Sequence, residues 1–227
     1  MKLLFTCEHA SNVIPEEYRN LFKGATKILN THRGYDPGAL DLFKELQKMA
    51  DFSSTYSISR LLVEVNRSIG HPDLFSEFTK GLSSAEKNTI INTWYNPYRK
   101  KVEDQIKKHL ESGEKVLHLS VHSFTPNLNG EIRNADIGLL YDPSRKDEKL
   151  FCKDLKSNLS LEDASLKIRF NYPYLGKADG FTTYLRRKFP KLYSGVELEI
   201  NQKFEKANKM DKKLKETIFK ALQQTLK

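Results

Sequence analysis

Short apolar runs that end in polar residues recur along the chain and predict buried strands. The first run, Lys2 to Thr6, leads into Cys7-Glu8-His9, and another, Val116 to Val121, leads into His122. Further strands are predicted over 55–58, 61–65, 137–141, 166–170 and 195–200. In open α/β sheets, ligands bind at the carboxyl ends of the strands. We therefore expect the polar strand ends to gather at one functional edge.

Apolar residues at helical spacing lie between these strands and predict helices over 15–22, 37–50, 145–158, 182–189 and 204–226. Asp36 can cap the second of these helices. Ser83 and Glu86 form a capping box that begins a helical region reaching Ser112, which Pro97 should kink. The alternation of strands and helices predicts one three-layer α/β/α domain over residues 1–227, with a mostly parallel central sheet.

Composition and charge narrow the possible partners. The formal net charge is +9, but the lysines are spread among glutamates and no nucleic-acid-binding signature accompanies them. No apolar run approaches the roughly 18 residues of a membrane span, and the N-terminus lacks the layout of a secretion signal. The two cysteines are far apart in the sequence and predict reduced thiols. We expect a cytoplasmic protein with no nucleic-acid or membrane partner.

The predicted strand ends carry a set of residues that suits metal-assisted hydrolysis. Two histidines and one carboxylate meeting at a point would hold Zn²⁺ and leave its fourth position open for water. A further carboxylate could act as general base, and an arginine could bind a carboxylate of the substrate. The candidates at the strand ends are Glu8, His9, Asn66, Arg67, His122 and Glu199.

Five motifs in order also resemble one known family. They are Cys7–Pro15 (CEHASNVIP), Tyr35–Ala39, Ser59–Leu61 with Asn66–Arg67, Val121–Phe124 and Glu197–Gln202. This pattern resembles the N-formylglutamate amidohydrolase family, which is similar in fold and chemistry to zinc carboxypeptidases and aspartoacylases. The resemblance implies a phosphorylase/hydrolase-like fold and hydrolysis of an amide beside a carboxylate-bearing amino acid. N-formylglutamate, an intermediate in histidine degradation, would be such a substrate.

The resemblance also implies a zinc site. It assigns His9 and His122 as ligands of Zn²⁺. The third ligand is open: carboxypeptidases use His-x-x-Glu, but Asn12 occupies that position here. Asp36 is the first choice, with a helix cap as its alternative role. Glu8 is the second choice, either as a ligand or as a group that orients His9.

The same resemblance implies roles for the other polar residues. Asn66 and Arg67 would hold the carboxylate of a small-molecule substrate, and Arg60 would polarise the scissile carbonyl or bind a second carboxylate. Glu199 would be the catalytic base. Glu197 lies on the same strand face by the period of two, and the residues after Glu199 favour the latter.

Two other interpretations remain open. His32 to Ala39, with His122 and Glu199, also resembles the zinc amidases that cleave N-acetylmuramoyl-L-alanine, in which His32 would replace His9 as a ligand. A non-catalytic basic binding protein on the same fold is the third possibility. The sequence does not determine the substrate or the oligomeric state.

Overall fold

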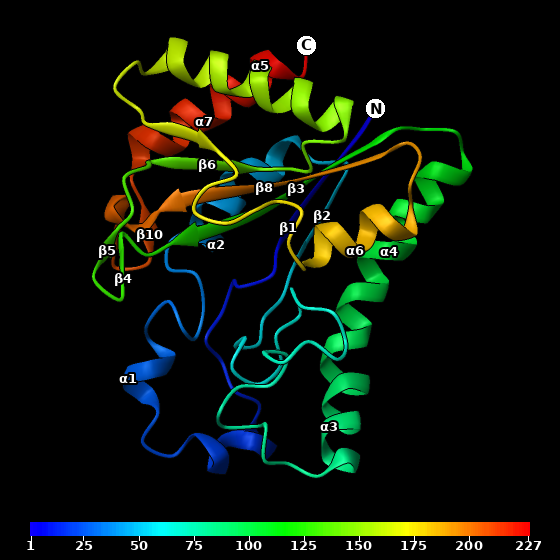
Figure 1. The fold of residues 1–227 in the computed structure, drawn as a ribbon, viewed down its shortest axis with the longest axis vertical. Coiled ribbons are helices and arrows are strands. Elements are labelled where there is room, and N and C mark those ends of the chain that lie inside the picture. Colours follow the sequence, from blue (N-terminus) through cyan, green and yellow to red (C-terminus); the bar gives the residue numbers. More distant parts are fainter.

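A six-stranded sheet forms the centre of the molecule in the computed structural model, which describes residues 1–227 (Figure 1). Its strands lie in the order β2-β1-β3-β8-β6-β7. Their bounds are β1 Lys2–Cys7, β2 Phe52–Thr55, β3 Val116–Phe124, β6 Ile137–Leu140, β7 Ile168–Phe170 and β8 Tyr193–Asn201. All neighbouring pairs are parallel except β6 and β8. The mostly parallel sheet of the predicted α/β fold is therefore confirmed.

Each face of the sheet packs against its own layer, because successive side chains of a strand point to opposite faces. Leu3 and Phe5 of β1 join one core, and Leu4 joins the other. The first core is covered by α2 (Ala39–Leu46), α5 (Lys146–Glu162) and α7 (Lys212–Thr225). The second is covered by α3 (Ser84–Ile90), α4 (Asn96–Glu111) and α6 (Phe181–Lys188). Figure 1 shows α5 and α7 on one side of the sheet and α4 and α6 on the other.

The helical region from 83 to 112 contains an irregular turn. The predicted capping box is present, since the side chain of Ser83 accepts from the Glu86 amide and the side chain of Glu86 accepts from the Ser83 amide. A π-helical turn, Ile91–Tyr95, then separates α3 from α4, and Pro97 lies in the first turn of α4. The chain is helical without a gap from 84 to 111, and Pro97, which has no amide hydrogen for an α-helical bond, directly follows the π turn. The predicted irregularity thus occurs where the two helices meet.

Two predicted elements near the site are wrong. The helix predicted to begin at Pro37 begins at Ala39, because Gly38 is the N-cap with φ of +80° and no side chain caps it. Asp36 is therefore not a helix cap. The strand predicted over 61–65 is a buried irregular segment that pairs with no strand, and its Glu64 amide donates to the Leu74 carbonyl instead.

The C-terminal helix is shorter than predicted. It begins at Lys212 rather than Phe204, with the side chain of Asp211 accepting from the Leu214 amide at 2.8 Å. A small hairpin of β9 (Glu205–Lys206) and β10 (Lys209–Met210) precedes it. The turn between these strands places Ala207 and Asn208 at positive φ. The apolar residues between 204 and 210 have helical spacing, but this segment forms a hairpin, and the helix starts only after it.

Short elements complete the chain. They are 3-10 turns over Glu16–Phe22, Gln47–Met49 and Gln202–Phe204, helix α1 (Thr26–Leu29), and a hairpin of β4 (Asn127–Leu128) and β5 (Glu131–Ile132). No helix in the structure combines the length and apolar character that a bilayer span requires.

Candidate metal centre and active site

The carboxyl ends of three neighbouring parallel strands supply the central side chains of the site. His9 follows β1 by two residues, His122 lies near the end of β3, and Glu199 lies on β8. His122 and Glu199 are partners in the β3–β8 register, so their side chains emerge side by side. The topology therefore brings together residues that are 190 positions apart in the sequence, as the polar strand ends predicted.

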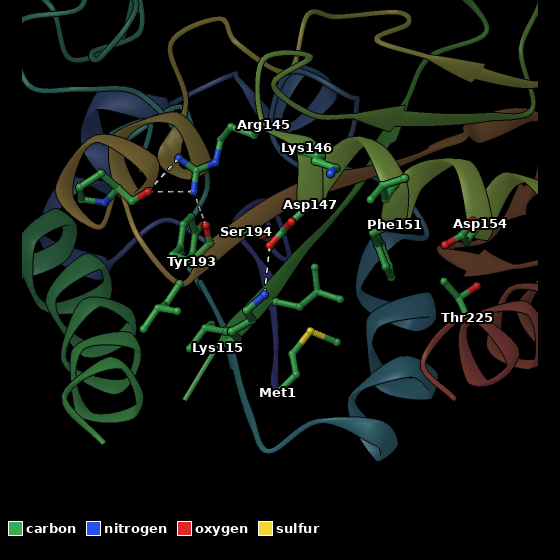
Figure 2. A pocket seen from close by; sticks show the side chains of 15 residues that line it. Met1, Lys115, Arg145, Lys146, Asp147, Phe151, Asp154, Tyr193, Ser194 and Thr225 are labelled. Carbon is green, nitrogen blue, oxygen red and sulfur yellow. Dashed lines mark hydrogen bonds and ion pairs between the residues drawn. The ribbon is translucent and has the colours of Figure 1, made fainter. Parts of the chain in front are cut away.

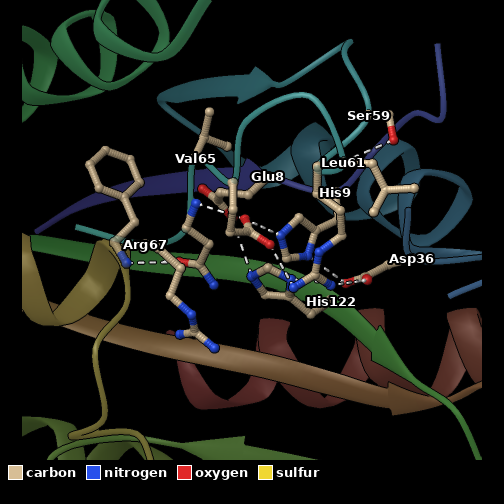
Figure 3. A network of polar contacts seen from close by, with 12 residues as sticks. Glu8, His9, Asp36, Ser59, Leu61, Val65, Arg67 and His122 are labelled. Carbon is tan, nitrogen blue, oxygen red and sulfur yellow. Dashed lines mark hydrogen bonds and ion pairs between the residues drawn. The ribbon is translucent and has the colours of Figure 1, made fainter. Parts of the chain in front are cut away.

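His9, Asp36 and His122 form a buried cluster (Figure 3). The Oδ2 atom of Asp36 lies 3.2 Å from Nδ1 of His9 and 2.9 Å from Nδ1 of His122. One donor atom from each residue lies within 4.8 Å of the others. Asp36 reaches this position because the chain between Gly34 and Gly38 crosses the ends of β1 and β3. The backbone amide of Asp36 donates to the His9 carbonyl at 2.9 Å.

Carboxylates also orient the far nitrogen of each imidazole. Nε2 of His9 lies 2.7 Å from Oε1 of Glu64. Nε2 of His122 lies 2.8 Å from Oγ of Ser120, which donates its own hydrogen to Glu8, so Nε2 must be the donor. Both Nε2 atoms therefore carry hydrogens, so each ring, when neutral, has its Nδ1 lone pair on the side of Asp36. Histidine ligands of metals are commonly held in this way.

The charges around the cluster match a divalent cation. Glu8, Asp36 and Glu64 are buried carboxylates, and the guanidinium of Arg60 is the only permanent cation in contact with them. With neutral imidazoles this leaves two negative charges in a buried site, which is costly without compensation. Burial alone would lower the pKa of His122, yet its hydrogen bonds to Asp36 and Glu8 raise that pKa well above its usual range, so the surroundings favour added positive charge, which either a proton on the ring or a cation can supply. The imidazoles and carboxylate therefore fit Zn²⁺, for which nitrogen and carboxylate ligands are usual.

Glu199 is a buried carboxyl group without a complete set of partners. Glu199 is only 5% exposed, and its Oε2 atom has no hydrogen-bond partner. Burial, followed by the negative charges of Asp36 and Glu197, raises the pKa of Glu199 to about 8, although His122 opposes the shift. A buried carboxyl with a raised pKa beside a metal-type cluster is a typical candidate for proton transfer.

These groups line a cavity of about 360 Å³. Besides the cluster and Glu199, its walls include Arg60, Asn66, Arg67, Ser123, Glu197 and parts of the 173–179 segment. The position of Glu197 is fixed by the hydroxyl of Thr182, which donates to it at 2.6 Å. A cavity of this volume has the size of a small-molecule site.

The three residues expected to contact substrate have different surroundings. Arg60 donates to Glu64 at 2.6 Å and lies 3.5 Å from Asp36, so its charge supports the cluster as well as facing the cavity. Asn66 accepts from the Phe181 amide at 2.7 Å through Oδ1. Arg67 donates from Nη1 to the Asp179 carbonyl and has no carboxylate partner. Arg67 is therefore the cavity arginine with the most donors left for a ligand.

Two carboxylates differ from what the sequence led us to expect. Glu8 contacts His122 at 3.3 Å rather than His9, and it is held by the phenol of Tyr98 at 2.9 Å. It does not belong to the His9–Asp36–His122 cluster. The sequence patterns did not identify Glu64 as part of the site. Its place within the apolar run Leu61–Val65 is nevertheless a signal, because an acidic residue in a buried segment needs a partner.

The remaining histidines lie outside the cluster. His118 is fully buried in β3, between the hydroxyl of Thr6 at 2.7 Å and that of Tyr193 at 2.8 Å, which is the environment of a structural histidine. His32 is half-buried in a neighbouring cavity and makes no hydrogen bond to the cluster. The layout that replaces His9 with His32 therefore finds no support in the geometry.

Comparison with known proteins gives a consistent result. Residues 1–204 match the model of a family described as N-formylglutamate amidohydrolase. The gene product Atu2144 from Agrobacterium tumefaciens is 27% identical with a TM-score of 0.79, and the match covers 100% of this chain and 92% of that one. The N-formylglutamate amidohydrolase from Ralstonia eutropha JMP134 is 15% identical with a TM-score of 0.67, over 100% and 92% of the two chains, and shows the shared fold. No curated protein matches the chain.

Proposed function

Because the chain belongs to the N-formylglutamate amidohydrolase family, we propose that it is a zinc-dependent amidohydrolase acting on an N-formyl or other N-acyl amino acid such as N-formylglutamate. The family predicted from the sequence motifs is confirmed. Membership of this family indicates that the protein is a hydrolase. The observation that carries the finer proposal is the buried His9–Asp36–His122 cluster beside the unpaired carboxyl of Glu199 in one cavity.

His9, Asp36 and His122 would hold the zinc ion, with Glu64 and Glu8 orienting the two imidazoles. When bound, zinc would supply Lewis acidity that polarises the amide carbonyl and acidifies a water molecule. Arg60 would keep Asp36 and Glu64 ionised, and so able to act as ligand and orienting group. This arrangement leaves the cavity side of the cluster for substrate.

Glu199 would move the proton. Beside bound zinc, the carboxyl group of Glu199 would be shifted toward its ionised form. The carboxylate would then accept a proton from the attacking water. The new bond forms between the water oxygen and the acyl carbon, the carbon–nitrogen bond breaks, and Glu199 returns the proton to the departing amine.

Arg67 and Asn66 would bind the carboxylate of the amino-acid part. The guanidinium of Arg67 lies at the cavity wall without a carboxylate partner, and the side chain of Asn66 makes its hydrogen bond through Oδ1, which leaves its Nδ2 atom as a donor for a ligand. A planar guanidinium and a carboxylate can form two parallel hydrogen bonds, which sets the orientation of the scissile amide. The substrate is therefore a small molecule with at least one carboxylate.

A direct test is to load the protein with zinc and screen N-formyl- and N-acetyl-amino acids for release of the free amine. We expect one bound zinc per chain and turnover of an acidic N-formyl amino acid. His9→Ala and His122→Ala should lose both metal and turnover, whereas His32→Ala should keep them. Zinc retention by His9→Ala and loss by His32→Ala would instead support the cell-wall amidase layout. Bound zinc without turnover of any N-acyl amino acid would indicate a binding protein.

A further inference from the structure

Arg99 is a buried arginine whose charge the proposed mechanism does not use. It lies on α4 and is 3% exposed. No carboxylate lies within ion-pair distance of it, and burial lowers the pKa of its guanidinium. A buried charge is normally paired, because its desolvation is costly. Other contacts must therefore stabilise the charge of Arg99.

Those contacts are two backbone carbonyls on either side of Asn66. Nη1 of Arg99 donates to the Val65 carbonyl at 3.2 Å and to the Arg67 carbonyl at 2.9 Å. The phenol of Tyr95 donates to the same Arg67 carbonyl at 2.7 Å. One guanidinium and one phenol therefore hold the backbone of the Asn66–Arg67 pair, whose side chains face the catalytic cavity.

The guanidinium itself is fixed by aromatic rings. Its central carbon lies 4.3 Å from the ring centre of Tyr184, 4.5 Å from that of Phe181 and 4.9 Å from that of Tyr95. These distances are within the range of cation–π attraction, which partly replaces a carboxylate. The Phe181 amide also donates to Oδ1 of Asn66. Phe181 thus contacts Arg99 through its ring and the side chain of Asn66 through its backbone amide.

The π-helical turn Ile91–Tyr95 ends at Tyr95, directly before α4. Tyr95 and Arg99 are four residues apart, so they lie on one face of the helix and reach the same carbonyl. Such turns interrupt regular helices rarely and often at functional sites. The local departure from α-helix therefore coincides with the two donors that hold the Arg67 backbone.

We propose that Arg99, assisted by Tyr95, is a positioning residue that fixes the Asn66–Arg67 pair in the orientation required to bind the substrate carboxylate. The proposal rests on the proposed function for the identity of the ligand, but not for the positioning itself. Arg99 touches neither the cavity's metal-type cluster nor Glu199. Its loss should therefore weaken substrate binding while leaving metal binding and the chemical step intact.

The kinetic test compares Arg99→Met, Arg99→Lys and Tyr95→Phe with the parent enzyme. A small misplacement of a binding group can cost about 100-fold, so we expect KM to rise at least about tenfold in Arg99→Met with kcat within about twofold. Tyr95→Phe, which removes only a hydroxyl, should raise KM less. Arg99→Lys should not restore KM, because a compact ammonium does not reproduce a planar guanidinium that stacks on three aromatic rings. An unchanged KM in Arg99→Met, or an equal fall in kcat, would overturn the proposal.

Arg145 provides a control in another pocket, which is lined by the first residues of β3 and β8 (Figure 2); unlike Arg99, it also pairs with a carboxylate, that of Glu148, at 3.1 Å. It also donates to backbone carbonyls, those of Pro190 and Tyr193, far from the catalytic cavity. Arg145→Met should lower the melting temperature without changing KM. A KM increase as large as that of Arg99→Met would show that general destabilisation, not positioning, is responsible.

Hydrogen exchange tests the positioning without any turnover. The amides of Asn66, Arg67 and Ser68 are hydrogen-bonded to Glu64 and Asp179 in the parent structure. Arg99→Met should speed exchange in the peptide that covers 65–68, and Arg145→Met should not. Faster exchange in a protein that hydrolyses no N-acyl amino acid would leave the positioning role standing and reject only the proposed substrate. Unchanged exchange would reject the positioning role itself.

Discussion

Glu199 lies directly opposite His122 in the parallel pairing of β3 with β8, so a buried carboxyl and a cluster imidazole emerge next to each other from the sheet. The strand pairing holds this spacing without any help from loops. The relationship joins the two halves of the proposed chemistry, because His122 belongs to the metal-type cluster and Glu199 has the unpaired oxygen.

Glu199→Gln should abolish most turnover while keeping the metal. The substitution preserves shape but removes the group that accepts and returns the proton, so we expect kcat to fall about 100- to 10,000-fold. Zinc content by elemental analysis should stay at the parent level. Glu197→Gln is the neighbouring control on the same strand face, and it should retain more activity. Parent-like turnover in Glu199→Gln would remove Glu199 as the base.

Glu64→Gln and Glu8→Gln should weaken metal binding through the imidazoles they orient. Each variant keeps a hydrogen-bond acceptor but loses the charge that makes His9 or His122 a stronger ligand. Substitutions of such orienting groups typically cost about 10- to 100-fold in metal affinity. Competition with a fluorescent zinc chelator measures this change. Glu16→Gln, at an exposed position, is the control, and equal affinities in all three variants would contradict the orienting role.

Arg67→Ala should act mainly on substrate binding. A hydrogen bond to a charged group contributes about 1.5–3 kcal/mol, which corresponds to a rise in KM of about 10- to 100-fold. Zinc affinity should not change, because Arg67 contacts no residue of the cluster. Arg33→Ala is a suitable control: Arg33 is an exposed arginine that pairs with Glu77 in the neighbouring cavity. An unaltered KM in Arg67→Ala would place the substrate carboxylate elsewhere.

His118 should make the folded state sensitive to mild acid. Burial lowers the pKa of His118 to about 4, whereas the unfolded chain has a histidine pKa of about 6.5. Between these values the unfolded chain binds the extra proton, so this contribution is full above the unfolded pKa and is lost as the pH falls toward 4. From about pH 7.5 to pH 5 we expect a loss of about 2 kcal/mol in the free energy of unfolding.

Urea unfolding of the parent and of His118→Gln at both pH values isolates this contribution. The variant should be less stable at pH 7.5 but should lose about 2 kcal/mol less on acidification, because other titrating groups are common to both proteins. His71→Gln, at a partly exposed loop position, should follow the parent curve. Parallel curves for the parent and His118→Gln would show that His118 does not titrate as its burial requires.

The amino-acid sequence was enough to predict the three strands that supply His9, His122 and Glu199. Alternation and apolar runs placed His9 and His122 at the ends of two strands and Glu199 on a third, and the structure makes these three strands neighbours. The family motifs pointed to the same residues. Local patterns were enough for these residues because parallel strands in one sheet place their carboxyl ends along the same edge.

The pairing of each carboxylate with its imidazole is seen only in the folded structure. Asp36 lies between both histidines, Glu8 supports His122, and Glu64 supports His9 from a segment that was predicted to be a strand. These partners come from irregular segments, whose path depends on packing and on glycines at special backbone angles rather than on a repeating pattern. Charge pairing in a buried site is a property of three-dimensional distances, and no spacing along the chain specifies it.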